Sequence, residues 1–351
     1  MDQFVRVRLI QCNSLDLNLF QFDYDLTFAA FFLNADRTIY GRFGTRSSEK
    51  EASRDISITG FRKAMEGALE LHRDYPKSRD ILKAKTGLPA KFKIAQDFPS
   101  LSGKYTPFLD YKGQVARSCI HCHMLGEAAR KDARSEQGVM PDKAIYPWPM
   151  PNILGLVFDP TERATLKSVI PGSPAETSGF QAGDEILTLE KQPLLSIADV
   201  QWVLHQSWAP QTLHSAVKRD GKTIPIRLPL AADWRRSSDI SWRTTSWDLR
   251  RIATGGLLLK SLDAQQRKQA KIEPGQLALR VEHVGQYGAH AVAKKAGFKE
   301  NDIITAFDDI TRDVRETELF AHVLRKHEAG TIVPVTVLRQ GELQSFRLKI
   351  Q

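Results

Sequence analysis

The residues Ser178-Gly179-Phe180-Gln181-Ala182-Gly183-Asp184-Glu185-Ile186-Leu187 carry the strongest structural signal in this chain. The block recurs as Ala296-Gly297-Phe298-Lys299-Glu300-Asn301-Asp302-Ile303-Ile304-Thr305. In both copies Gly-Phe precedes a polar turn that ends in Asp, and apolar residues follow. A turn of this kind followed by aliphatic residues predicts the start of a strand. The recurrence of the whole block indicates two copies of one structural unit.

Each copy of the block continues with the same order of elements. A strand and a polar turn lead to an amphipathic helix, predicted over 197–205 in the first copy and over 316–326 in the second. Ser196 is the expected N-cap of the first of these helices. Each copy then closes with paired strands, joined at Arg219-Asp220-Gly221-Lys222 and at Arg339-Gln340-Gly341-Glu342.

This pattern resembles PDZ domains of the bacterial type, in which Ala/Gly-Phe-x-x-Gly-Asp-x-Ile follows a short helix. The resemblance places the first PDZ domain over 152–231 and the second over 272–351. PDZ domains bind an extended peptide as an added strand, next to their long helix. In the first copy the resemblance implies a site for protein or peptide C-termini, formed by Ile153, Leu154, Gly155, Leu156, Val157, Val200, Val203 and Leu204.

Some positions of the two copies depart from this pattern. Ile153 replaces the first glycine of the carboxylate-binding loop, and the apolar helix positions are equally typical of a domain core. In the second copy Gly275 to Arg280 holds the loop position without the Gly-hydrophobic-Gly pattern, which favours a docking or scaffold role. Residues 232–271 are predicted to be a linker. Acidic residues such as Asp239 interrupt its tryptophans and arginines, so no nucleic-acid partner is expected.

Cys119-Ile120-His121-Cys122-His123 is a separate signal. C-x-x-C-H is the attachment sequence of c-type haem, in which the two cysteines form thioether bonds and the histidine binds the iron. It predicts haem c on Cys119 and Cys122, with His123 as an iron ligand. The proline-flanked Met150 is the first candidate for the sixth ligand and Met140 the second, and an open sixth position is the alternative. The two cysteines also suit a dithiol–disulfide pair, a metal site or a fixed disulfide.

Residues 1–75 have a different pattern, which resembles the C-terminal half of a thioredoxin fold. The first strand and the helix that would carry the thioredoxin C-x-x-C are missing, and no signal peptide is recognisable. We therefore expect the true start of the chain to lie upstream. Cys12 is expected to be a half-buried structural thiol. The predicted elements are strands over 4–10, 27–33 and 38–43, followed by a helix whose apolar face runs from Phe61 to His72. Ser57 and Thr59 are the candidates for its N-cap.

The composition fits a globular chain of several domains. Of its 351 residues, 42% are hydrophobic and 26% are charged. A chain of this length is longer than one hydrophobic core organises. The net charge of +9 is spread along the sequence, and no apolar run approaches the ~18 residues of a membrane span. The predicted fold class is multi-domain α+β. It comprises the partial thioredoxin-like segment (1–75), a connector with a helical C-x-x-C-H segment (76–150) and two PDZ-like β-barrel or β-sandwich domains.

The combination resembles a family of bacterial thioredoxin-like/PDZ proteins, and it predicts a binding or electron-transfer protein rather than an enzyme. Peptide binding would be coupled to a c-type haem that serves redox chemistry or sensing, with a redox partner. The alternatives are a thiol–disulfide protein that uses Cys119 and Cys122, and a PDZ scaffold with a structural metal or disulfide. Because haem c is attached outside the cytoplasm, we expect a periplasmic or envelope location if the N-terminus is truncated, and a cytoplasmic one otherwise.

Overall fold

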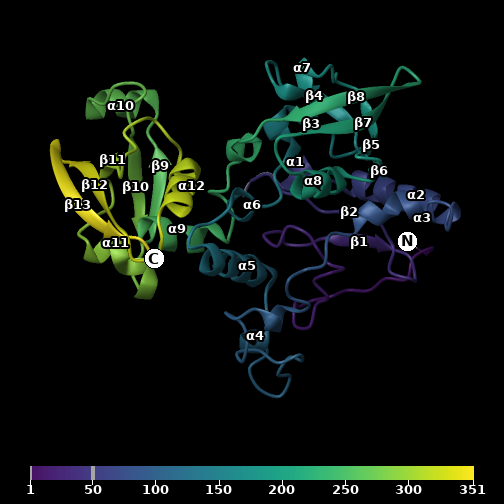
Figure 1. Cartoon of the computed structure of the whole chain (residues 1–351), viewed down its shortest axis with the longest axis horizontal. Coiled ribbons are helices and arrows are strands. Elements are labelled where there is room, and N and C mark those ends of the chain that lie inside the picture. Colours follow the sequence, from purple (N-terminus) through teal and green to yellow (C-terminus); the bar gives the residue numbers. More distant parts are fainter. Residues whose placement is uncertain (1, 49–51) are drawn as a thin grey trace. The chain divides into compact units, whose positions relative to one another are not determined.

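The computed structural model describes residues 2–48 and 52–351 (Figure 1). The chain divides into two compact units, Met1–Ala129 with Tyr146–Ser238, and Arg130–Ile145 with Asp239–Gln351. Each unit contains one copy of the repeated block. None of the described helices is both long enough and apolar enough to cross a membrane.

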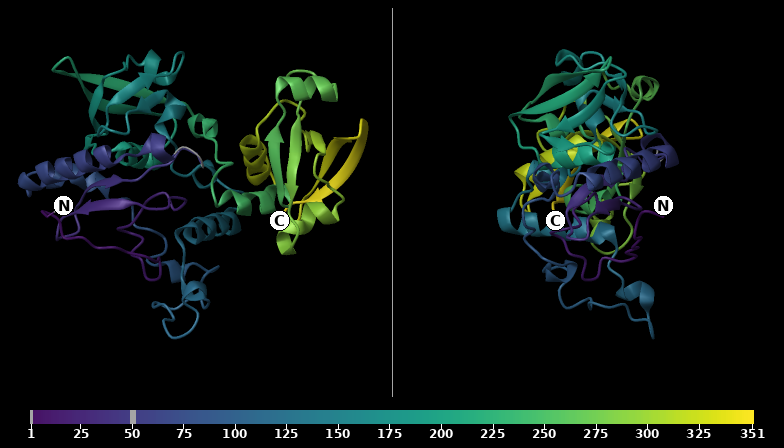
Figure 2. Two further views of the ribbon diagram at one scale, coloured as in Figure 1. Left: turned by 180° about the vertical axis from the view of Figure 1, so that it is seen from behind. Right: turned by 90° about the vertical axis from the view of Figure 1, so that its right-hand side faces the viewer.

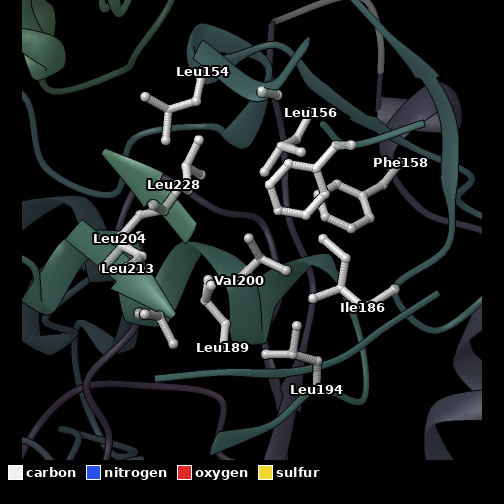
Figure 3. Close-up of a cluster of buried hydrophobic side chains, with 14 of the residues drawn as sticks. Leu154, Leu156, Phe158, Ile186, Leu189, Leu194, Val200, Leu204, Leu213 and Leu228 are labelled. Atoms are coloured by element: carbon white, nitrogen blue, oxygen red, sulfur yellow. The ribbon is translucent and has the colours of Figure 1, made fainter. Parts of the chain in front are cut away.

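The first copy of the block forms a small antiparallel β domain. Strands β3 (Leu156–Phe158) and β4 (Leu166–Val169) pair with each other, and a second sheet has the order β6-β5-β7-β8. The other elements are β5 (Glu185–Leu189), β6 (Gln192–Pro193), β7 (Gln211–Arg219), β8 (Lys222–Leu230), α7 (Pro174–Thr177) and α8 (Ile197–Gln206). Figure 3 shows the core, where Leu156, Ile186 and Val200 from β3, β5 and α8 meet Leu213 and Leu228 from β7 and β8.

The second copy forms one antiparallel sheet of five strands in the order β13-β12-β11-β10-β9, green to yellow in Figure 2. Helix α12 (Glu316–Lys326) has the predicted bounds. The strands are β9 (Leu257–Ser261), β10 (Leu279–Val284), β11 (Ile303–Phe307), β12 (Ile332–Arg339) and β13 (Glu342–Lys349). The remaining helices are α6 (Asp142–Ile145), α9 (Ser246–Thr254), α10 (Ala264–Ala270) and α11 (Val292–Lys295).

The Asp that ends each repeated block is a buried anchor. In the first copy the Arg219 guanidinium donates to both carboxylate oxygens of Asp184, at 2.6 and 2.7 Å, and also to the Gly179 carbonyl. The second copy repeats the arrangement between Arg339 and Asp302, again at 2.6 and 2.7 Å. Both carboxylates are almost completely buried. Bidentate pairing offsets the cost of that burial, which explains why Asp recurs in the block.

Removal of this anchor is expected to destabilise the first unit. Arg219→Ala leaves the Asp184 carboxylate buried without its cation, and we expect a loss of about 3 kcal/mol in the free energy of unfolding. Urea denaturation followed by circular dichroism measures the loss. The control is Lys218→Ala, since Lys218 is exposed and its amine lies 3.6 Å from Glu185. Equal stability of the two variants would contradict the assignment.

In the N-terminal region the structure confirms the strand predicted over 38–43 and the helix after Ser57, and it shortens the strand predicted over 27–33. Strands β1 (Ala30–Leu33) and β2 (Ile39–Phe43) form an antiparallel hairpin, and α2 (Ile58–Arg73) follows. The Ser57 side chain accepts a hydrogen bond from the Gly60 N–H, as expected of an N-cap. The predicted buried strand over 27–33 is shortened to its last four residues.

The strand predicted over 4–10 is wrong. This stretch has no regular structure, and Val5 and Val7 are 95% and 79% exposed. Alternating apolar residues form a strand only where a neighbouring strand satisfies the backbone. Among the described residues the β1–β2 sheet has two strands and no third joins it. The resemblance to a thioredoxin fold is therefore not supported.

The connector over 76–150 contains short helices and one long helix. The helix predicted from Cys119 onward is confirmed as α5 (Cys122–Gln137), which begins within the motif and ends before Gly138, whose φ is 70°. The short elements are α3 (Arg79–Leu82), α4 (Val115–Ser118), and two 3-10 turns, η1 (Lys83–Lys85) and η2 (Ala95–Asp97); α1 (Ala52–Asp55) precedes them in the chain.

Residues from both the N-terminal region and the connector pack directly on α8 of the first β domain. The Lys85 ammonium lies 2.8 Å from the Asp199 carboxylate, and both side chains are fully buried. The Arg42 guanidinium lies 3.8 Å from the ring centre of Trp202, a cation–π contact. The outward face of α8 is thereby covered, which makes residues 1–129 and this domain one unit.

Candidate peptide-binding groove and cysteine cluster

The loop that precedes β3 requires glycine at position 155. Pro151–Leu154 forms the 3-10 helix η3, and Gly155 ends it with a φ of 92°. A Cβ at Gly155 would lie 1.9 Å from Oγ of Ser173. The N–H groups of Ile153 and Gly155 already donate to carbonyls of the same turn, at 3.3 and 2.9 Å. This loop therefore presents fewer free N–H groups than a glycine-rich carboxylate loop would.

A pocket of about 490 Å³ lies beside β3. Among the described residues β3 pairs only with β4, so its other edge can receive an added strand. Strand β3 contributes all three of its residues to the wall, and α8 contributes Ile197. The other lining residues are Ser47, Arg54, Asp55, Met150, Pro151, Asn152, Pro160, Lys167 and Ile170.

The charges at this pocket favour an anionic peptide. Arg54 and the exposed Lys167 line it. Among the described residues of the lining, Asp55 is the one with an acidic side chain, and it accepts hydrogen bonds from the N–H and the hydroxyl of Ser47, at 2.6 and 2.7 Å. Within the described lining, an acidic side chain or a terminal carboxylate would therefore meet more positive than negative charge.

The residues of α8 that were predicted to bind peptide do not line this pocket. Val200, Val203 and Leu204 are buried in the core and do not line the pocket. Figure 3 shows Val200 pointing toward Leu156 and Phe158. The residue of α8 that reaches the pocket is Ile197, which the sequence prediction missed. Helical spacing identifies an apolar stripe, but it does not say which part of the stripe meets a groove.

In the second copy, the loop that corresponds to the one ending at Gly155 lies at Gly255-Gly256. The Gly256 carbonyl accepts from the N–H of Gly285, as the Gly155 carbonyl accepts from that of Ile170, each at 2.9 Å. Strand β9 follows this loop and pairs with β10, as β3 pairs with β4. The predicted loop at Gly275 to Arg280 is therefore wrong, because this stretch leads into β10.

The second β domain also begins earlier in the chain than the predicted boundary at residue 272. Residues 232–271, predicted to be a linker, contain α9, β9 and α10, and β9 is an edge strand of the second sheet. The signal that could have shown this is Thr254-Gly255-Gly256-Leu257, a glycine pair directly before an aliphatic run.

The groove of the second copy is filled by its own side chains. Glu316, the first residue of α12, accepts the N–H of Leu259 on β9 at 2.8 Å. The Arg250 guanidinium on α9 donates to both oxygens of Glu316, at 3.0 and 2.6 Å. Burial raises the pKa of Glu316, and the hydrogen bonds from Arg250 oppose this. An added strand would have to displace this buried pair.

Cys12 lies beside the C-x-x-C-H segment, which the sequence analysis did not predict. Its Sγ is 3.4 Å from that of Cys122, and it is only 2% exposed, more buried than expected. The Cys12 N–H donates to the Ile120 carbonyl at 3.0 Å, and Asn13 Oδ1 accepts the Ile120 N–H at 2.8 Å. These bonds hold the two thiols together. The thiol of Cys122 thus contacts the thiol of Cys12, and both are free.

The thiols of Cys12 and Cys122 differ in pKa. The hydrogen bond from Cys12 lowers the pKa of Cys122 to about 7, although burial opposes the change. The hydrogen bond with Cys122, together with burial, raises the pKa of Cys12 far above its usual range. Cys122 is therefore the member that ionises, and a thiolate is the reactive form of cysteine.

The remaining residues of the motif face other partners. Cys119 Sγ is 4.0 Å from Nδ1 of His121, and His123 Nδ1 is 3.5 Å from the Glu127 carboxylate, which raises the pKa of His123. Cys122 borders a core with many aromatic side chains: Phe20, Phe22, Tyr24, Phe92, Phe98 and Tyr105.

A c-type haem needs both thiols of the motif and the adjacent histidine at one porphyrin. The three residue types are present, but Cys122 Sγ lies against the buried Cys12, and His123 lies against Glu127. Met150 lines the pocket beside β3, where its sulfur accepts a hydrogen bond from the Thr45 hydroxyl at 3.2 Å. The arrangement fits a thiol pair better than a haem ligand set.

The two β domains with their repeated anchor match the PDZ family in sequence. A family model described as PDZ domain matches residues 152–230 and 288–350, and the chain contains two such domains.

Over part of its length the chain is similar to curated relatives named as DegP-like serine endoproteases. One relative is the "Probable periplasmic serine endoprotease DegP-like" of Marinomonas sp. (strain MWYL1), 26% identical over 193 residues, which are 55% of this chain and 38% of the relative. Another is the "Probable periplasmic serine protease do/HhoA-like" of Haemophilus influenzae, 32% identical over 118 residues, 33% of this chain and 24% of the relative. The chain thus spans well under half of either relative. Among solved structures, "HtrA-type protease AlgW with decapeptide" matches with 13% identity over 40% of this chain and 48% of that chain, at a TM-score of 0.25.

Proposed function

We propose that this protein binds extended C-terminal peptide segments of partner proteins through its first PDZ domain. The observation that carries the proposal is the pocket between the open edge of β3 and Ile197 of α8. A peptide would add as a strand to β3, with apolar side chains against Ile170 and Ile197 and acidic groups near Lys167 and Arg54. The second domain, whose groove Glu316 and Arg250 fill, serves as a structural module.

The periplasm or cell envelope is the proposed location. The DegP-like relatives are named as periplasmic proteins, which supports this location. We do not extend the proposal to proteolysis, because the region that matches this chain is only 38% of the length of the Marinomonas relative.

A C-terminal peptide library tests the binding proposal. Fluorescence anisotropy should select peptides with acidic side chains and an apolar end, and calorimetry should give one bound peptide per chain. Amidation of the terminus should weaken binding if the carboxylate reaches the loop at Gly155. Two equivalent sites per chain would contradict the filled second groove, and the absence of any binding peptide would overturn the proposal.

We also propose a second function, reversible disulfide formation between Cys12 and Cys122, on the strength of their 3.4 Å separation. The Cys122 thiolate would attack a disulfide of a partner or of glutathione and release one thiol. The Cys12 thiolate would then attack the mixed disulfide and release the second thiol. Two protein thiols are oxidised while one external disulfide is reduced to two thiols, so atoms and electrons balance.

Haem c on Cys119 and Cys122, with His123 at the iron, is the competing proposal for these residues. It would supply electron transfer, and its thioether at Cys122 excludes the disulfide. Co-expression of an exported form with a haem-maturation system separates the two proposals. A Soret band that survives denaturation would replace the thiol proposal, and a colourless protein that oxidises reversibly would support it.

A further inference from the structure

Three side chains of the second PDZ domain converge on one carboxylate oxygen. Asp308 directly follows β11, His322 lies on α12 and His327 directly follows this helix. The Nε2 atoms of both histidines lie 2.9 Å from Oδ2 of Asp308. All three candidate ligand atoms lie within 4.8 Å of one another.

The spacing is close to that of a tetrahedral metal site. Zinc binds imidazole nitrogen and carboxylate oxygen at about 2.0–2.2 Å, which sets neighbouring ligand atoms about 3.3 Å apart. The distances here, from 2.9 Å to at most 4.8 Å, bracket that value. Asp309 is not part of this group of three, but one of its carboxylate oxygens lies 3.0 Å from His322 Nε2, which makes it the candidate for a fourth ligand. Small side-chain rotations would bring the three grouped atoms around one ion, and rotation of the exposed Asp309 side chain would add the fourth.

The site already attracts a cation. The Lys326 ammonium lies 2.8 Å from oxygens of both Asp308 and Asp309. The carbonyl groups at the C-terminal end of α12 add negative potential. The side chains of Asp308, His322 and His327 are between 12% and 21% exposed, so they are shielded but reachable. Lys326 is 43% exposed and can turn into solvent when a dication replaces its ammonium.

We propose that Asp308, His322 and His327, with Asp309 as the fourth ligand, bind Zn²⁺. Two imidazoles favour zinc over Mg²⁺ and Ca²⁺, which prefer oxygen ligands alone. Each histidine binds the ion through an unprotonated Nε2, with its remaining proton on Nδ1. The ion ties the turn after β11 to the end of α12.

Zinc titration of the chelator-treated full chain, in competition with a chromophoric chelator, tests the site. His322→Ala and His327→Ala should each weaken zinc binding by more than about 30-fold. Lys326→Met should strengthen it, because it removes the competing ammonium. His283→Ala is the matched control and should change nothing, since this histidine lies in the same domain beside Glu300.

Cobalt separates this site from the cysteines. Ligation by nitrogen and oxygen should give weak visible bands, whereas thiolate ligation adds strong ultraviolet charge-transfer bands. Unchanged zinc affinity in a folded His322→Ala/His327→Ala double variant would overturn the proposal. Weaker binding by Lys326→Met would also overturn it, and this variant keeps the test decisive if loss of the histidines prevents folding.

Discussion

Cys12→Ser is expected to abolish disulfide formation in this protein, whereas Cys119→Ser should leave it intact. The reason is geometric, because Cys122 Sγ lies 3.4 Å from Cys12 Sγ, and the Cys12 N–H bonds to the backbone of the motif. The measurement is oxidation with oxidised glutathione, alkylation of the remaining thiols and mass spectrometry of peptides. Wild type and Cys119→Ser should both yield the Cys12–Cys122 cross-link.

Cys122→Ser is the matched control, since it removes the thiol that either pairing requires. The C-x-x-C pairing of Cys119 with Cys122 predicts the reverse pattern, with loss in Cys119→Ser and retention in Cys12→Ser. That reverse result would overturn the assignment of Cys12. Circular dichroism of each variant establishes that a missing cross-link does not come from unfolding.

Ile170→Glu is expected to weaken peptide binding by about 30-fold or more. Ile170 lines the pocket, and its N–H bonds to the Gly155 carbonyl, so its side chain lies beside the loop. A carboxylate at this position repels acidic peptides and removes an apolar contact. The side chain is 42% exposed, so the fold should tolerate the change. Fluorescence anisotropy with a selected peptide measures the loss.

The matched control is Ile332→Glu, which makes the same substitution at a 51% exposed position of the second copy. It should leave peptide affinity unchanged. Lys167→Glu supplies an intermediate case, with weaker binding of acidic peptides and unchanged binding of neutral ones. Equal affinities of Ile170→Glu and Ile332→Glu for the peptide would show that the pocket beside β3 is not the binding site.

Local signals in the sequence predicted most of the regular elements correctly. The turns at Asp220-Gly221 and Gln340-Gly341 place both central residues at positive φ, as two-residue hairpins require. Ser57 and Ser196 cap their helices as expected. The failures came where a local pattern depended on a partner. The alternating residues 4–10 found no neighbouring strand, and Gly275 only resembled a loop that Gly255-Gly256 provides.

The sequence by itself determined the two PDZ folds, since turns, caps and apolar periodicity are properties of consecutive residues. Only the tertiary structure decided how their chemistry is arranged. Cys12 and Cys122 are 110 positions apart, and Leu259 and Glu316 are 57 apart. Residues this far apart in the chain meet only through packing of whole elements, which no local pattern encodes. That packing leaves the first groove open and fills the second, and it gives Cys122 a partner outside its own motif.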